Sequence, residues 1–195
     1  MQIILYDTEF TAWEGSQERN WSLHWEYKEI IQFSAKKLHL TALNFDLIDE
    51  FHTFVKPIKN VQLSNYIMEL TKINQDQIEQ GLSAQQLFAE IHQFSENFEV
   101  PMYSWGNDLH VLEETAHIHN ICLKHLNSCD LRPIFEQFSI NTNVSSGQLF
   151  KNFDIDLSIQ EHNALDDTLS LYESLKQLHK QNPKKLVTLF TDEIP

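Results

Sequence analysis

Ile3-Ile4-Leu5-Tyr6-Asp7-Thr8-Glu9 is an apolar run that ends in two carboxylates. The run predicts a buried β-strand, and residues two apart on a strand share a face, so Asp7 and Glu9 point the same way. Mg²⁺ usually takes one or two carboxylates together with water and phosphate oxygens, which suits this pair. The alternative is a strand end whose acids only face solvent, because Asp-x-Glu is a short and common pattern.

A second acidic residue, Asp108, stands where a predicted strand at 101–105 gives way to a predicted helix at 107–120. Asn and Asp both cap helices by accepting hydrogen bonds from the free backbone N–H groups of the first turn. Asn107 can fill that role as well as Asp108 can. One cap is enough, so a functional use of Asp108 is slightly favoured.

The third segment of interest, His162-Asn163-Ala164-Leu165-Asp166-Asp167, leads into a predicted helix at 163–180. Five helical steps turn a side chain by roughly 140°. His162 and Asp167 therefore face one site only if His162 belongs to the preceding loop. The alternatives are a surface histidine, one of ten in the chain, and acids placed favourably at the positive end of a helix dipole. We expect one of Asp166 and Asp167 to have only that second role.

These segments, in this order, resemble the DEDDh 3′–5′ exonucleases, the superfamily of ribonuclease T, oligoribonuclease and the proofreading subunit of bacterial DNA polymerase III. That family has Asp-x-Glu on its first strand, an Asp after its fourth strand and His-x-Ala-x-x-Asp entering its last helix. The matching residues here are Asp7, Glu9, Asp108, His162, Ala164 and Asp167. By position Asp167, not Asp166, matches the metal-binding Asp. The likeness covers nearly the whole chain, and the insert after Glu9 is closer to a bacterial branch similar to histone-mRNA exonucleases.

The order of the predicted elements indicates an α/β domain with a mixed sheet flanked by helices. Strands at 2–7, 29–40 and 46–56 are joined by the long connection 10–28 and a short turn, which predicts that these first three strands are antiparallel neighbours. The resemblance implies a ribonuclease H-like fold. Further helices are expected at 67–73, 83–98, 131–138 and 145–152, and a further short strand at 126–130.

The resemblance also implies a domain organisation. We expect one exonuclease domain over residues 1–180 and a C-terminal tail, 181–195, that packs on it or extends it. The apolar stretch 186–190 of this tail is expected to form an extra strand or to mediate a contact.

The activity that the resemblance implies is hydrolysis of the terminal phosphodiester of single-stranded 3′ ends of RNA or DNA, which releases nucleoside 5′-monophosphates. Two divalent cations, Mg²⁺ or Mn²⁺, would be held roughly 3.5–4 Å apart. Their expected ligands are Asp7, Glu9, Asp108 and Asp167. The expected catalytic residues are His162, as the base, and Glu9, and the expected substrate-binding residues are Phe10, Thr11 and Trp13. We expect Trp21 and Trp25 to serve mainly in packing the long loop.

One departure from the family pattern lies at Thr71-Lys72-Ile73, where the family usually has Thr-Gly-Ile or His-Gly-Ile. Glycine adopts a left-handed backbone freely, whereas lysine does so at a cost. We therefore expect a rearranged turn here, with no loss of a proposed metal ligand.

Composition limits the function further. A chain of 195 residues with 42% hydrophobic residues is long enough for one domain with a substantial core. The N-terminus lacks the basic flank of a signal peptide, no apolar stretch is long enough to span a membrane, and two cysteines are too few for a disulfide framework, so a soluble cytoplasmic protein is expected. The formal net charge of −14 opposes strong duplex binding and favours an enzyme that engages only the end of one strand.

Two alternatives stay open from the sequence. One is a non-catalytic nucleic-acid-binding or interaction module on the same fold, which usually has lost a ligand, and none is missing here. The other is a proofreading subunit that acts within a polymerase, against which the short tail counts. The preference between RNA and DNA is open, and so is a homodimer, since several members of the superfamily are dimers.

Overall fold

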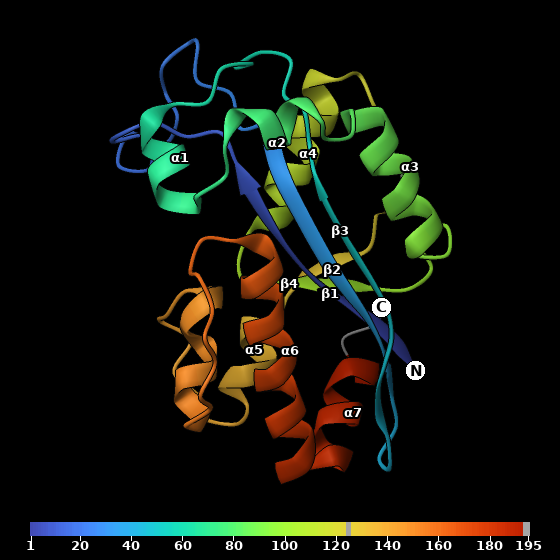
Figure 1. Cartoon of the computed structure of the whole chain (residues 1–195). Helices are drawn as coiled ribbons and strands as arrows, with labels where there is room; N and C mark the ends of the chain where they lie inside the picture. Colours follow the sequence, from blue (N-terminus) through green and yellow to red (C-terminus); the bar gives the residue numbers. More distant parts are fainter. Residues whose placement is uncertain (124–125, 193–195) are drawn as a thin grey trace.

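The computed structural model describes residues 1–123 and 126–192. One five-stranded sheet runs through it in the order β3-β2-β1-β4-β5 (Figure 1). The three N-terminal strands are antiparallel neighbours, whereas β4 pairs parallel with both β1 and β5. The mixed sheet with three antiparallel strands is therefore confirmed. The strands are β1 (Gln2–Phe10), β2 (Ile30–Leu40), β3 (Phe45–Phe54), β4 (Met102–Ser104) and β5 (Ser128–Asp130).

Helices lie in each region where the sequence predicts them. They are α1 (Asn65–Thr71), α2 (Gln75–Glu79), α3 (Ala84–Phe94), α4 (Asp108–Ile118), α5 (Arg132–Glu136), the 3₁₀ helix η1 (Ser146–Phe153), α6 (Ala164–Gln181) and α7 (Pro183–Asp192). The predicted helix at 83–98 ends early, because the backbone at residues 96–98 turns to positive φ. Ser83 caps α3, as its place before the apolar pattern suggests.

The sheet separates two apolar cores. Ile4 and Tyr6 of β1 pack on the side of α3 and α4, whereas Ile3 and Leu5 pack on the side of α5, α6 and α7. Figure 1 shows these two helix groups, green and orange to red, on opposite sides of the strands. The alternation continues along β1, so Asp7 and Glu9 emerge on the α6 side.

The C-terminal segment does not form the extra strand that was one of its two expected roles, and it packs on the domain as a helix instead. Residues 183–192 form α7, because Pro183 suits the first position of a helix and the apolar residues Leu186 and Phe190 recur at a spacing of four. Both side chains are fully buried, and the Phe190 ring lies against Tyr103, with 4.9 Å between the centroids. Residues 193–195 of the expected tail lie outside the described residues.

The structure also corrects the expectation for the turn after α1. Lys72 itself adopts the left-handed backbone, with φ of 60°, and its N–H closes α1 on the carbonyl of Met68. The prediction that the missing glycine rearranges this turn is therefore wrong. Lysine takes the conformation that glycine takes more cheaply, and the C-cap hydrogen bond helps to offset its cost.

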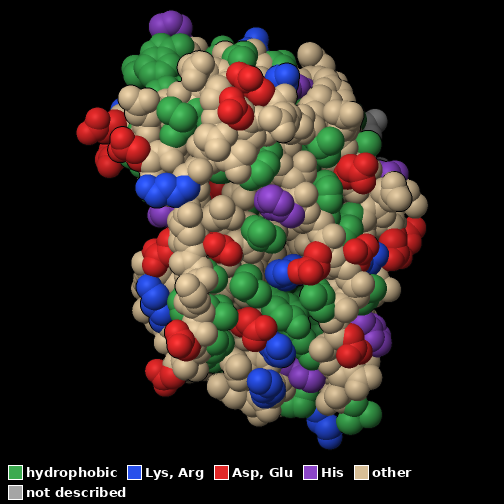
Figure 2. Space-filling view, in the orientation of Figure 1, with side chains coloured by type: hydrophobic (Ala, Val, Ile, Leu, Met, Phe, Trp, Pro, Cys, Tyr) green, Lys and Arg blue, Asp and Glu red, His purple; other side chains and the backbone are tan. Residues whose placement is uncertain are grey.

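Charged side chains are spread over the surface. Figure 2 shows acidic and basic side chains interspersed over one face, without a continuous basic stripe. Within residues 1–123 and 126–192, no helix is both long and apolar enough to cross a membrane.

Candidate active site

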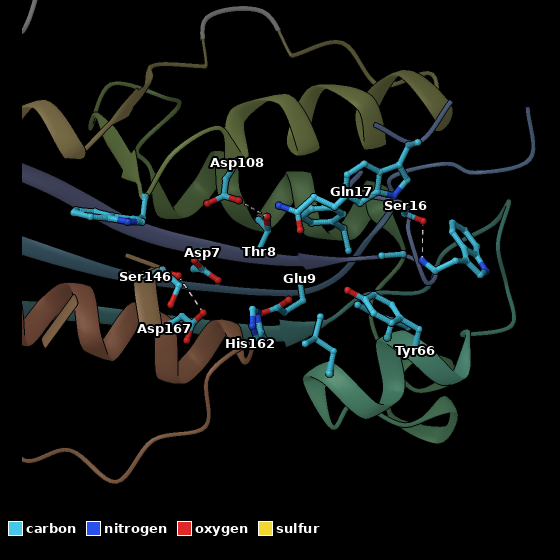
Figure 3. A pocket seen from close by; sticks show the side chains of 18 residues that line it. Asp7, Thr8, Glu9, Ser16, Gln17, Tyr66, Asp108, Ser146, His162 and Asp167 are labelled. Atoms are coloured by element: carbon cyan, nitrogen blue, oxygen red, sulfur yellow. Dashed lines mark hydrogen bonds between the residues drawn. The ribbon is translucent and has the colours of Figure 1, made fainter. Parts of the chain in front are cut away.

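Three carboxylates meet at the end of β1. Asp7 and Glu9 come from the strand and Asp167 from the first turn of α6, and one oxygen of each lies within 4.8 Å of the others. Their side chains face one another in Figure 3. All three residues are at most 8% exposed. The structure thus brings together three of the four predicted ligands, from segments about 160 positions apart in the chain.

Asp167 is held tightly by η1. The Ser146 hydroxyl donates to Asp167 Oδ2 at 3.1 Å, and a Cβ added at Gly147 would lie 2.3 Å from Oδ1. A residue larger than glycine at position 147 would therefore displace this carboxylate. Oδ1 has no hydrogen-bond partner among the described residues. A buried carboxylate oxygen without a donor is an expected ligand for a cation.

Asp108 approaches the same region from the other side of the sheet. Its Oδ1 accepts a hydrogen bond from the hydroxyl of Thr8, the residue between Asp7 and Glu9, at 3.0 Å. Asn107 precedes α4, but its side chain makes no capping hydrogen bond. The argument that Asn107 caps the helix and so leaves Asp108 for another role therefore does not explain the placement of Asp108. Asp108 is not part of the close group of three, but it lines the same pocket.

The electrostatics of the four carboxyl groups favour a bound cation. Burial, followed by the charges of the neighbouring acids, raises the pKa of Asp7 and of Glu9 well above the ordinary range. Burial also raises the pKa of Asp108 and of Asp167, each to about 7. No ion pair within the described part of the chain includes any of the four. Buried acids without cationic partners fit hard divalent ions, which take oxygen ligands and offset this repulsion.

The stability of the metal-free protein should fall as pH rises. A carboxyl group whose pKa is raised by folding keeps its proton where the unfolded chain has lost it, so the free energy of unfolding decreases from near pH 4 to near pH 7. Metal ions compete with those protons, and the rise in Tm on adding Mn²⁺ should therefore grow over the same range. Melting curves in EDTA and in Mn²⁺ at pH 5 to 8 measure both effects. Asp167→Asn should show a flatter pH dependence than wild type, and an equal slope would contradict this account.

His162 lies in the loop before α6, as the helical geometry requires. Its φ is 61°, and its exposed side chain lines the pocket that holds the carboxylates. Asn163 caps the helix through a hydrogen bond to Leu165 N, and the Asp167 N–H donates to the Asn163 carbonyl at 2.8 Å. Asp166 points elsewhere and accepts the Gln160 N–H at 2.9 Å. Of the two adjacent acids, only Asp167 lies with Asp7 and Glu9.

A pocket of about 350 Å³ joins this acidic end to an aromatic end. Its aromatic wall includes the predicted Phe10 and Trp13, together with Trp21 and Tyr66, which the sequence did not suggest as pocket residues. Trp21 does more than pack the loop, because its ring meets Phe10, with 5.6 Å between the centroids, and faces the pocket. Tyr66 enters the pocket from α1, and the sequence of that helix did not predict that Tyr66 would line a pocket.

Thr11 is not where the prediction of substrate binding requires it. Its side chain is buried and does not line the pocket. The hydroxyl donates to the Tyr27 carbonyl and accepts the Glu29 N–H at 3.0 Å, so it ties the two ends of the long loop together. We therefore leave Thr11 out of the substrate-binding set.

A mixed sheet of this topology, with carboxylates gathered at the end of its first strand, defines a ribonuclease H-like nuclease fold. A family model described as Exonuclease, of the RNase T type, matches residues 4–175. The chain belongs to this RNase T exonuclease family, and the resemblance to DEDDh exonucleases is confirmed.

Two relatives show how the likeness is distributed. The probable 3′–5′ exonuclease KapD of Bacillus subtilis (strain 168) is 22% identical over 177 residues, which cover 89% of this chain and 82% of KapD. ERI1 exoribonuclease 2 of Xenopus laevis is 35% identical over 80 residues, or 41% of this chain. The match covers only 10% of that longer protein.

The solved structures agree on the fold. The nuclease domain of 3′hExo, a DEDDh family member bound to rAMP, superposes with a TM-score of 0.79 at 17% identity and covers 94% of both chains. The Escherichia coli ExoI–ssDNA complex gives a TM-score of 0.69 at 16% identity, and covers 97% of this chain and 43% of that one.

Proposed function

We propose that this protein is a 3′–5′ exonuclease that hydrolyses the terminal phosphodiester of single-stranded RNA or DNA and releases nucleoside 5′-monophosphates. The observation that carries the proposal is a single pocket lined by four carboxylates, a loop histidine and an aromatic wall. The relatives support it, since KapD is described as a probable 3′–5′ exonuclease and the related solved structures include complexes with rAMP and with single-stranded DNA.

The proposed metal ligands are Asp7, Glu9, Asp108 and Asp167, for two Mg²⁺ or Mn²⁺ ions. When bound, such ions supply Lewis acidity that acidifies water and stabilises charge on the scissile phosphate and on the leaving 3′ oxygen. The free Oδ1 of Asp167 and the raised pKa of each carboxyl group support this assignment.

The remaining pocket residues have separate roles in the proposal. His162 takes the proton from the attacking water, since it lies at the mouth of the acidic end and an imidazole is an effective base near neutral pH. Phe10 and Trp13 stack on the terminal bases, and each stacked base contributes about 1–3 kcal/mol. Glu9, which lines the same pocket, acts both as a metal ligand and as a catalytic residue in this proposal.

The charge of the chain favours a single-stranded end over a duplex. With a net charge of −14, the protein has little means to neutralise many phosphates at once, and the face shown in Figure 2 carries no continuous basic stripe. Metal contacts and stacking need only the last nucleotides.

The cytoplasmic location, the homodimer and the division at residue 180 stay predictions from the sequence.

Digestion of 5′-labelled 20-nucleotide RNA and DNA, each single-stranded and duplex, tests the proposal. We expect a ladder that shortens from the 3′ end with Mg²⁺ or Mn²⁺, release of nucleoside 5′-monophosphates, slower attack on duplexes and no reaction in EDTA. Internal cleavage, release from the 5′ end or full activity in EDTA would contradict the proposal. Binding without hydrolysis would favour a non-catalytic binding module.

A further inference from the structure

Gln32 is a buried amide in β2 that bonds to the start of α6. It is 1% exposed and lies directly opposite Glu9 in the antiparallel register, so the two side chains share a face of the sheet. Gln32 Oε1 accepts the backbone N–H of Ala164 at 2.9 Å, and Nε2 donates to Asn163 Oδ1 at 3.1 Å. The two residues that follow His162 are therefore both fastened to the sheet by one side chain.

The orientation of this amide is fixed by a third neighbour. Gln32 Nε2 also lies 2.9 Å from Nε2 of His52, on β3. A primary amide has two N–H donors, so Asn163 and a neutral His52 ring together use both. Turning the amide over would set its NH₂ group against the N–H of Ala164, donor against donor. Gln32 can thus hold the start of α6 in only one way.

This anchor bears on His162 because it holds the two residues that follow it, whereas the bonds of Gln160 and Glu161 hold the loop that precedes it. The His162 ring is exposed, and its φ of 61° belongs to a backbone region that residues other than glycine seldom occupy. On the preceding side, the Gln160 side chain donates to the Thr71 carbonyl at 2.7 Å. On the following side, Gln32 supplies the link to the sheet that carries Asp7 and Glu9.

We propose that Gln32 is a positioning residue, which directs the His162 imidazole at the carboxylate group by holding Asn163 and Ala164 against β2. The inference rests on the proposed function, in which His162 is the base. Gln32 itself does not line the pocket, so its effect on the reaction passes through the loop. A shift of about 1 Å in a catalytic group costs about a hundredfold in rate, so even partial loss of this anchor is measurable.

Gln32→Met keeps the length of the side chain and removes its hydrogen bonds. We expect kcat to fall by about 10- to 100-fold, with KM and the half-maximal metal concentration unchanged. Added to His162→Ala, the same change should cost less than about threefold more, because no base remains to be directed. Hydrogen exchange of the amides of residues 162–165 in metal-free protein should also become faster.

Gln75→Met is the matched control, since the Gln75 amide also fastens a loop by two backbone hydrogen bonds, from the Leu63 N–H and to the Val61 carbonyl, both at 3.0 Å, and none of these residues lines the pocket. It should leave kcat and the exchange of residues 162–165 unchanged. If Gln32→Met does not fold, Asn163→Ser removes the bond to Gln32 while serine can still cap α6, and it carries the same expectations. An unchanged kcat, or an equal loss in the His162→Ala background, would overturn the inference. A wild-type protein without nuclease activity would instead overturn the proposed function.

Discussion

Asp7→Asn should abolish nuclease activity, with kcat lower by about a thousandfold or more, while the fold stays intact. The change preserves the volume of the side chain and removes one carboxylate from the group of three whose oxygens lie within 4.8 Å of one another. If this group binds the divalent ions, several kcal/mol of transition-state stabilisation is lost with it, which is at least a thousandfold in rate.

The same substitution should stabilise the protein in EDTA. Burial and three neighbouring acids raise the pKa of Asp7, so the charged form is unfavourable when no cation is bound, and a neutral amide avoids that repulsion. We therefore expect a higher Tm than wild type in EDTA and a much smaller gain in Tm on adding Mn²⁺. Asp156→Asn, at an exposed position, removes a charge elsewhere and should change neither quantity. An active Asp7→Asn protein would exclude the mechanism.

The sequence predicts the strand part of the site well, for a local reason. Side chains alternate along a strand, so the apolar run before Asp7 was enough to place Asp7 and Glu9 on one face. The helical geometry likewise placed His162 in a loop and Asp167 on the helix. Both inferences concern neighbours in the chain, where backbone geometry fixes direction.

The supporting residues could not be found in this way, because their partners are distant in the chain. Thr8 gave no sign of the hydrogen bond to Asp108, 100 positions later, and Ser146 gave none of its bond to Asp167. Tyr66 reaches the pocket only because α1 packs beside the long loop. The error at Thr11 has the opposite cause: proximity to Glu9 suggested substrate contact, whereas the turn of the chain buries its hydroxyl.

The C-terminal segment shows that local patterns can also be ambiguous. A short apolar stretch such as 186–190 is compatible with a strand or a helix, and the packing partner decides between them. Here α6 and β4 already offer an apolar surface, and a helix buries Leu186 and Phe190 together against it.

His162→Ala should lower kcat by about 10²- to 10⁴-fold and leave metal binding largely unchanged. In the structure His162 lines the acidic end of the pocket but is not one of the three closely grouped acidic residues, and its exposed ring can reach a water molecule there. Loss of a base slows proton transfer without removing an oxygen ligand. The gain in Tm on adding Mn²⁺ should therefore stay close to that of wild type, in contrast to Asp7→Asn.

Imidazole added to the buffer separates a missing base from a damaged site. It should restore part of the activity of His162→Ala, because a small base can enter the space that the ring leaves, and it should restore none to Asp7→Asn, whose defect is a lost ligand. His110→Ala, an exposed histidine on α4 outside the pocket, should retain wild-type activity and show no response to imidazole. If His162→Ala instead lost the Mn²⁺-dependent gain in Tm, His162 would be a metal ligand, and the proton would have to pass to another group.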